Sequence, residues 1–182
     1  MNVKFTKMTG AGNDFVVIDD RMRRIRNAPK AAKLLCDRRW GIGADGLLLL
    51  QRSRRASYKM MYYNADGSYG GMCGNGGRCI AFYACSHKIA SRKHRFEALD
   101  HMYSATVSKT EVILTMKDPR NALSNIEIAL ESQLLPASFI DTGSPHAVVL
   151  MESLTGAGSL DDLDVLRLGR MIRQHGQFAP AG

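Results

Sequence analysis

The residues best suited to chemistry lie in one short stretch, Met72–Cys79, which reads MCGNGGRC. Cys73 stands ahead of glycines at 74, 76 and 77, and an apolar pattern typical of a helix follows over residues 80–85. The first N–H groups of a helix have no partner within it, and the helix dipole is positive there, so a thiolate is favoured over a thiol. The glycines permit a tight turn or a close approach to a ligand. We therefore expect a reactive sulfur beside a cradle for a carboxylate.

The other reading of Cys73 is a small cysteine buried in a turn, which is the commoner fate of a free cysteine. The four cysteines, at 36, 73, 79 and 85, have no CxxC spacing, so neither a zinc site nor a thioredoxin-type redox pair is expected. Cys79 and Cys85 lie six residues apart on the expected helix and so on different faces, where we interpret them as core thiols.

Two further loops carry polar residues that could join this site. Gly10–Asp14 separates expected strands at Val3–Met8 and Phe15–Asp19, and it could bring the amide of Asn13 into a site. A plain hairpin turn is the alternative, and the strand pattern favours it. Asn64 opens a turn after an expected strand at Tyr58–Tyr63, which places it near the end of the fold that holds Cys73 if strand and helix are neighbours.

Two other patterns are weaker. His146 ends the polar loop Thr142–His146, and taken alone it favours a surface-loop histidine. Gly41–Gly46 fits GxGxxG, but it precedes an apolar strand at Leu47–Leu50 instead of opening a helix after a strand. That order is wrong for a dinucleotide fingerprint, so NAD binding is not expected.

The positions of these residues depend on a pattern of strands and helices that restarts after Asp118–Arg120. We therefore expect a first domain over residues 1–117 and a second, incomplete domain over residues 118–182. The remaining expected elements are a helix at Ala28–Arg39, strands at His94–Asp100, Tyr103–Ser108, Val112–Met116, Ile126–Leu130, Ser138–Asp141 and Ala147–Met151, and a helix at Asp161–His175.

Composition indicates a globular protein, with 182 residues of which 45% are hydrophobic and 23% charged. No apolar run is long enough to cross a membrane, and the first residues lack a signal-peptide pattern, so we expect a cytoplasmic protein without disulfides. The net charge of +8 comes with basic runs at 21–26, 52–55 and 91–95. These runs could bind the phosphate backbone of a nucleic acid, but solvated loops are the favoured interpretation. No nucleic-acid partner is expected, because no recognition motif accompanies the basic runs.

Several motifs occur together in one order: Gly12–Phe15, Cys36–Gly46, Asn64–Ser68, Met72–Gly76 and Thr142–His146. As a set they resemble the N-terminal domain of diaminopimelate epimerases and part of its second domain. The resemblance implies an α+β fold of two similar domains, each a curved, mostly antiparallel sheet around a central helix, with the site in the cleft between them. It also implies that Cys73 is one of two catalytic cysteines.

The resemblance assigns roles to other positions. Asn13, Asn64, Gly74 and Asn75 match residues that hold the substrate, and His146 matches a histidine that assists catalysis. Ser144 stands where many members have Asn, and Gly46 where some have a substrate-contacting Gln.

The implied activity is the interconversion of LL- and meso-diaminopimelate in lysine and peptidoglycan synthesis, without pyridoxal phosphate, a metal or any other cofactor. Such a site must stabilise a developing carbanion with aimed donors and place a base and an acid on opposite faces of the carbon. The family's second catalytic cysteine and a Glu-Arg pair lie beyond residue 182, so we expect this chain alone not to epimerise. A homodimer is a candidate assembly. The alternatives are another cofactor-free racemase or isomerase of the same fold, such as a proline racemase, and a non-catalytic binding module.

Overall fold

The structure, a computed structural model, describes residues 3–130, 133–154 and 158–178. Packing of the chain divides it into a first unit, Met1–Met116, and a second unit, Lys117–Gly182. Among the described residues, none of the helices combines the length and the apolar character needed to cross a membrane.

The first unit is built on a seven-stranded sheet in which the strands lie side by side in chain order. Four of the six neighbouring pairs are antiparallel, and β2–β3 and β4–β5 are parallel. This confirms the expected mostly antiparallel sheet. The strands are β1 (Thr6–Gly10), β2 (Asn13–Asp19), β3 (Gly46–Gln51), β4 (Lys59–Asn64), β5 (Lys93–Ala98), β6 (His101–Val107) and β7 (Val112–Thr115).

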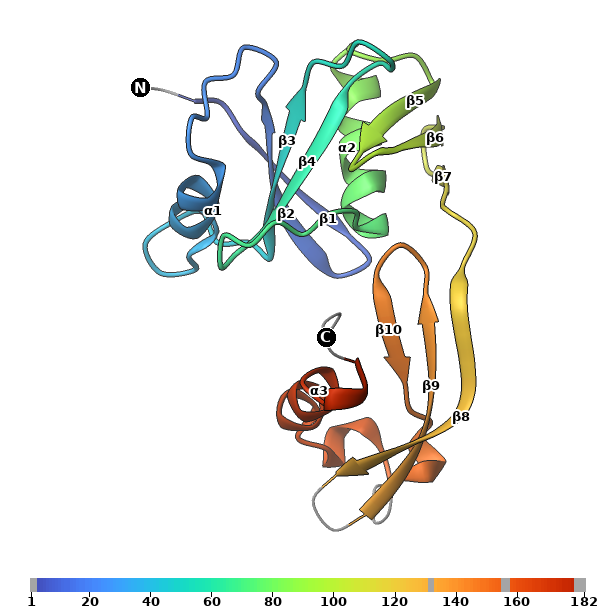
Figure 1. The fold of residues 1–182 in the computed structure, drawn as a ribbon. Helices are drawn as coiled ribbons and strands as arrows, with labels where there is room; N and C mark the ends of the chain where they lie inside the picture. The colour runs from blue at the N-terminus through green and yellow to red at the C-terminus, as the bar shows by residue number, and fades with distance from the viewer. Residues whose placement is uncertain (1–2, 131–132, 155–157, 179–182) are drawn as a thin grey trace. The chain divides into compact units, whose positions relative to one another are not determined.

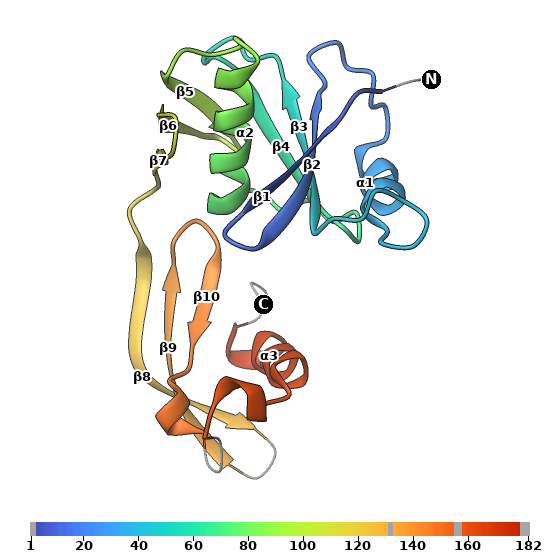
Figure 2. The same ribbon diagram turned by 180° about the vertical axis from the view of Figure 1, so that it is seen from behind.

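Both faces of the central strands are covered by helices. Alternate side chains of β2 and β3, such as Phe15 and Leu48, join the core beneath α2 (Gly74–Ser86), while their neighbours Val16 and Leu49 join the core beneath α1 (Ala28–Cys36). Figures 1 and 2 show the two helices on opposite sides of these strands. All four side chains are fully buried, which confirms the sequence expectation of a doubly covered strand.

Helix α2 is the centre of the first unit. It packs against β1, β2, β3 and β4 and also against β6 and β7. Because one helix touches both edge strands, β1 and β7, the sheet must curl around it. This is the arrangement that the family resemblance implies.

Helix α1 is shorter than expected and ends at Cys36 instead of Arg39. Asp37 leaves the helical conformation, with φ −59° and ψ 126°, and its carboxylate accepts the N–H groups of Arg39 and Trp40, so it folds the chain into a turn. The first strand also differs, since it runs from Thr6 to Gly10 and not from Val3.

The second unit is a three-stranded antiparallel sheet in the order β10–β9–β8, covered by α3 (Val165–Arg173). Its core gathers Ile128, Leu135 and Phe178. The strands are β8 (Arg120–Leu130), β9 (Gln133–Asp141) and β10 (Pro145–Val148), and short 3-10 turns lie at η1 (Met151–Ser153), η2 (Leu160–Asp162) and η3 (Gly176–Phe178).

Four expectations for this unit were wrong at their boundaries. Strand β9 starts at Gln133 instead of Ser138. The last strand spans Pro145–Val148, and Met151 begins η1 instead of ending that strand. Strand β8 starts at Arg120, six residues early, and two register shifts interrupt it. The last helix covers Val165–Arg173, because Asp164 caps it through the N–H of Arg167, whereas Asp162 closes a capping box with Ser159 in the preceding η2 turn.

Candidate active site

Cys73 is the N-cap residue of α2. Its backbone is extended, with φ −120° and ψ 122°, and its Sγ accepts the N–H of Gly76 at 3.5 Å. Its carbonyl oxygen accepts the first helical hydrogen bond, from the N–H of Gly77, at 2.7 Å. The side chain is partly exposed. The sequence expectation of a cysteine at a helix start is therefore confirmed, and the alternative of a fully buried cysteine is wrong.

The first turn of α2 leaves donors available next to this sulfur. No hydrogen bond among the described residues uses the backbone N–H of Gly74 or of Asn75. The Arg78 guanidinium lies over Gly74, since a Cβ added there would come 3.8 Å from its Nη1. Two open N–H groups, the positive end of a helix and a guanidinium suit a carboxylate.

The β1–β2 hairpin reaches this first turn. Ala11 and Gly12 form its two-residue turn with φ of 48° and 88°, the positive values that a tight hairpin requires. Glycine is needed at position 10 for a different reason. A Cβ added there would lie 2.9 Å from the backbone carbonyl oxygen of Asn75 and 3.0 Å from the Cys79 Sγ. The segment is thus both the hairpin turn that the pattern favoured and the element that brings Asn13 into the site.

A chain of hydrogen bonds fixes the two amides. Asn75 Nδ2 donates to Asn13 Oδ1 at 2.6 Å, and Asn13 Nδ2 donates to Asp45 Oδ2 at 3.3 Å. Arg78 Nη2 donates to Asn75 Oδ1. Each amide oxygen therefore faces a donor and each of these amide nitrogens an acceptor, so neither side chain can flip without losing its partners.

Asp45 is held by a cluster of charges behind the amides. The Asp14 and Asp45 carboxylates each accept the other's backbone N–H, at 2.9 and 3.1 Å. Arg38 pairs with both carboxylates, and Lys7 contacts Asp14 at 2.8 Å. Arg38 and then Lys7 hold the pKa of the Asp14 carboxyl well below its usual range. Sequence reasoning missed Asp45, Arg38 and Arg78, although Asp14 and Asp45 each stand in a glycine-containing loop.

Asn64 lies at the same end of the sheet as Asn13, because Gly46 pairs with Asn64 on one side and Phe15 on the other. Since Asn13 contacts the first turn of α2 through Asn75, this is the end of the fold that holds Cys73, as expected. The Asn64 Oδ1 accepts the Tyr62 hydroxyl at 2.6 Å, and its Nδ2 donates to Ser68 Oγ at 2.9 Å. Gly46 therefore lies beside Asn64 in the sheet.

Tyr62 is a second residue that the sequence did not single out. A Cβ on Gly46 would come 2.4 Å from its ring and one on Gly70 2.3 Å, so the ring lies between two glycines. Burial, and next the charge of Cys73, raise the pKa of Tyr62 to about 12, so its hydroxyl stays a donor to Asn64 at neutral pH. No local pattern in the sequence indicated this residue, because the two glycines reach its ring only through the pairing of β3 with β4 and the bridge from Tyr63 to Tyr69.

The other cysteines are less suited to act as bases. Cys36 and Cys79 are buried, and burial raises the pKa of each thiol to about 11. The assignment of Cys79 as a core thiol is confirmed, and Cys85 is partly exposed and packs against the same core. Across residues 3–130, 133–154 and 158–178, no group of three or more His, Cys, Asp or Glu side chains could hold a metal ion.

Ser144 and His146 belong to the second unit. His146 lies on β10, paired with Ile140, and not in the loop before it. It is exposed, and its Nε2 lies 3.0 Å from the Thr142 Oγ1. The loop is closed by Asp141, which accepts the Gly143 N–H, and Gly143 has a φ of 100° that favours glycine. The grouping around Cys73 described above is made within the first unit alone.

Comparison with known proteins gives matches over nearly the whole chain. The sequence model of a family described as diaminopimelate epimerase matches residues 5–120. A diaminopimelate epimerase of Chlorobaculum tepidum is 43% identical over 180 residues, covering 96% of this chain and 65% of that protein. One of Flavobacterium psychrophilum is 38% identical over 182 residues, covering 99% of this chain and 65% of its own length. The chain thus spans just under two thirds of the length of each of these two relatives.

Solved structures show the same fold at low sequence identity. A hydroxyproline epimerase of Agrobacterium vitis, with bound trans-4-hydroxy-L-proline, matches with a TM-score of 0.71 and 14% identity, covering 93% of this chain and 59% of that one. A probable proline racemase of Agrobacterium radiobacter gives a TM-score of 0.71 at 12% identity, covering 92% and 57%. These likenesses establish the expected fold class.

We predict that Gly46→Ala destabilises the first unit by about 1–3 kcal/mol, because the new Cβ would meet the Tyr62 ring and, at 2.7 Å, the Tyr63 carbonyl oxygen. Urea unfolding of the purified variant measures the loss. Gly74→Ala is the matched control, since its Cβ would meet only ordinary contacts at 3.8–3.9 Å and should cost under about 0.5 kcal/mol. Equal stability of the two variants would contradict the packing of Tyr62.

We predict that alkylation of the native chain at pH 8 modifies Cys73 and Cys85 but spares Cys36 and Cys79, whose folded pKa values are about 11. The unfolded thiols ionise near roughly pH 8.5, so the folded state retains protons that the unfolded chain releases. The free energy of unfolding should therefore fall as pH rises from about 8.5 to 11. Peptide mass mapping measures the labelling, and modification of Cys36 or Cys79 as fast as Cys73 would contradict the assignment.

Proposed function

The chain belongs to the diaminopimelate epimerase family, and from this premise we propose that it carries the first-domain part of a site that inverts an α-carbon of diaminopimelate without a cofactor. The observation that carries the proposal is the partly exposed Cys73 sulfur at the start of α2, beside the open N–H groups of Gly74 and Asn75. A base and a carboxylate cradle are thereby fixed on the same helical turn.

In the proposed complex the substrate's α-carboxylate sits on the first turn of α2. The N–H groups of Gly74 and Asn75 donate to its oxygens, and the Arg78 guanidinium adds a positive charge nearby. These donors matter more as the reaction proceeds, because the carbanion formed by loss of the α-proton delocalises its charge into the carboxylate. Asn13 and Asn64 then orient the rest of the substrate, with their amides fixed by Asp45 and Tyr62.

Cys73 acts on one face of the α-carbon. As a thiolate its Sγ takes the α-proton, and an acid on the other face returns a proton to the carbon, so the configuration inverts and no net proton is gained or lost. The family resemblance assigns the acid to a second catalytic cysteine. It also assigns His146 to assist catalysis and Ser144 to contact the substrate. We propose these two roles for His146 and Ser144 of the second unit.

The setting of the proposed reaction follows from the same family. We propose a role in lysine and peptidoglycan synthesis, a cytoplasmic location and a homodimer. The four cysteines are free in the structure, which is consistent with a reducing compartment. Each of these points stays a prediction.

Because the chain spans 65% of the length of its relatives, the activity is best tested in a complete protein. Residues 1–117 of this chain would replace the matching part of the Chlorobaculum tepidum relative. We predict that this chimera exchanges the α-proton of LL- and meso-diaminopimelate in deuterium oxide and interconverts the two, as followed by NMR. The 182-residue chain alone should not turn over either isomer.

The decisive variant is Cys73→Ala in the chimera, which should lower turnover by at least about 100-fold because the proton acceptor is removed. Cys85→Ala is the matched control and should leave turnover within about twofold, since that cysteine lies outside the first turn of the same helix. A folded chimera that inverts proline or trans-4-hydroxyproline but not diaminopimelate would favour the racemase alternative. Near-normal turnover by Cys73→Ala would refute the proposed role.

A further inference from the structure

The three basic runs of the sequence meet at one end of the first unit. The segment 20–27 follows β2, the segment 52–58 joins β3 to β4, and the segment 87–95 leads from α2 into β5. The Arg52 Nε donates to the Arg21 carbonyl oxygen at 3.3 Å, and the Ser57 N–H donates to that of Arg95 at 3.0 Å. In Figures 1 and 2 these connections lie at the opposite end of the sheet from the first turn of α2.

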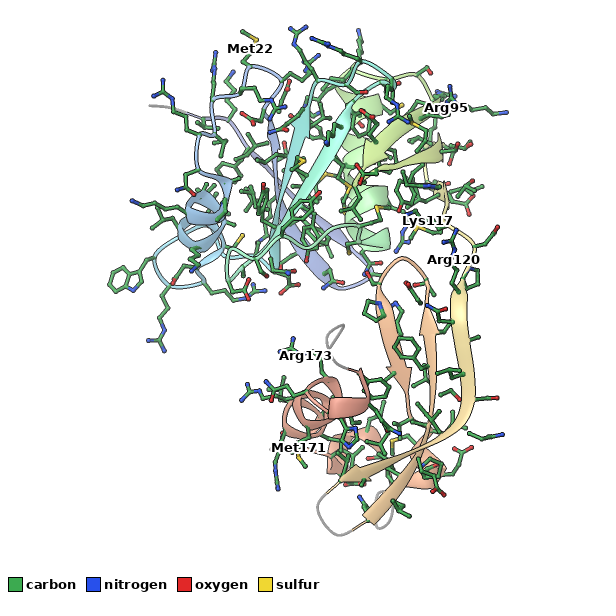
Figure 3. The ribbon with its side chains drawn as sticks, viewed as in Figure 1. Met22, Arg95, Lys117, Arg120, Met171 and Arg173 are labelled. Atoms are coloured by element: carbon green, nitrogen blue, oxygen red, sulfur yellow. The ribbon has the colours of Figure 1, made fainter. Side chains whose placement is uncertain are left out.

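This end of the unit accounts for the charge of the whole chain. The three segments hold eleven of the 25 Lys and Arg residues but only one of the 17 Asp and Glu residues, Asp20. That carboxylate is fully buried and is held by the Ile25 N–H and the Gln51 side chain, so it does not face the basic surface. Figure 3 shows the labelled Met22 at this end, among long nitrogen-tipped side chains.

A hollow of about 480 Å³ opens within this basic end. Its cationic lining comes from Lys4, Arg21, Arg24 and Arg52, its one carboxylate is Asp19, and Tyr83 contributes an aromatic wall from α2. Four positive groups therefore face one concave space against a single negative group.

Only Arg21 is neutralised by that carboxylate. Arg21 Nε and Nη2 donate to the two Asp19 oxygens at 2.9 and 2.7 Å. Among the described residues, Lys4 and Arg24 have no hydrogen bond or ion pair, and Arg52 uses only its Nε. Three cations thus line the hollow without a counter-charge, and their mutual repulsion would be relieved by a bound anion.

We propose that this hollow binds a small phosphorylated molecule that carries at least two negative charges. Guanidinium groups match phosphate oxygens with two parallel hydrogen bonds, and a lysine adds a point charge, so two arginines and Lys4 suit a pyrophosphate group. A concave space favours a compact ligand over a nucleic-acid strand, for which the basic segments offer no row of stacking aromatics.

The proposed site is separate from the one around Cys73. Asn13 and Asp19 are the first and last residues of β2, which places the hollow roughly 20 Å from the amide chain by the rise of a strand. A binding experiment on the hollow can therefore succeed or fail whether or not the proposed epimerase function is correct.

The test is calorimetric titration of the 182-residue chain with inorganic pyrophosphate and with ADP at low salt. We expect saturable binding of one ligand, weakened by about tenfold or more in Arg24→Ala and in Arg52→Ala, because each removes a charge-assisted contact. The matched controls are Arg26→Ala and Arg54→Ala, which lower the net charge equally from the same segments but do not line the hollow. These should weaken binding less than about twofold.

Three outcomes would overturn the proposal: no saturable binding, equal weakening by all four variants, or preferential binding of a single-stranded oligonucleotide with equal dependence on all four arginines. Shifts of the Arg24 and Arg52 Nε NMR signals of the unmodified chain on adding pyrophosphate provide a second readout that needs no variant. Signals that stay in place at saturating pyrophosphate would also overturn it.

Discussion

The hydrogen bond from Asn75 Nδ2 to Asn13 Oδ1 is the contact on which the rest of the site depends. It ties the β1–β2 hairpin to the first turn of α2 through two residues that are 62 positions apart in sequence. Gly10 permits the approach, since any side chain there would meet the Asn75 carbonyl. Once the hairpin is held against the helix, the Asn13 amide is fixed on one side of the first turn and the Cys73 sulfur lies at its start.

The first unit therefore has two electrostatically different ends. At one end, acids and bases are paired with each other: Asp14 and Asp45 share Arg38, and the neighbouring amides complete the pattern. At the other end, arginines outnumber acids and several lack partners. A site that must hold a substrate in one orientation gains from paired charges, because fixed dipoles need no reorganisation during the reaction. Unpaired cations are instead suited to collecting an anion from solution.

The sequence predicted what depends on local chemistry. The cysteine at the start of α2 follows from the glycines and the apolar pattern after it, and the double burial of β2 follows from its unbroken apolar run. Tyr62 and the Arg38–Asp45 pair could not be predicted, because their roles depend on strand register that no local pattern specifies. The pairing of Gly46 with Asn64 places an aromatic ring between glycines 24 residues apart. The predicted start of α3 was wrong for a local reason, since Asp164 caps the helix and Asp161 and Asp162 lie in the separate turn η2 before it.

The dependence of the site on this hydrogen bond is tested by a double-mutant cycle on Asn13 and Asn75. The free energy of unfolding would be measured for the unmodified chain, Asn13→Ala, Asn75→Ala and the double variant. A hydrogen bond between the two amides predicts a coupling energy of about 0.5–1.5 kcal/mol, because either single change removes the same contact. Additive losses, with a coupling energy below about 0.3 kcal/mol, would show that the hairpin and the helix are not joined through these side chains.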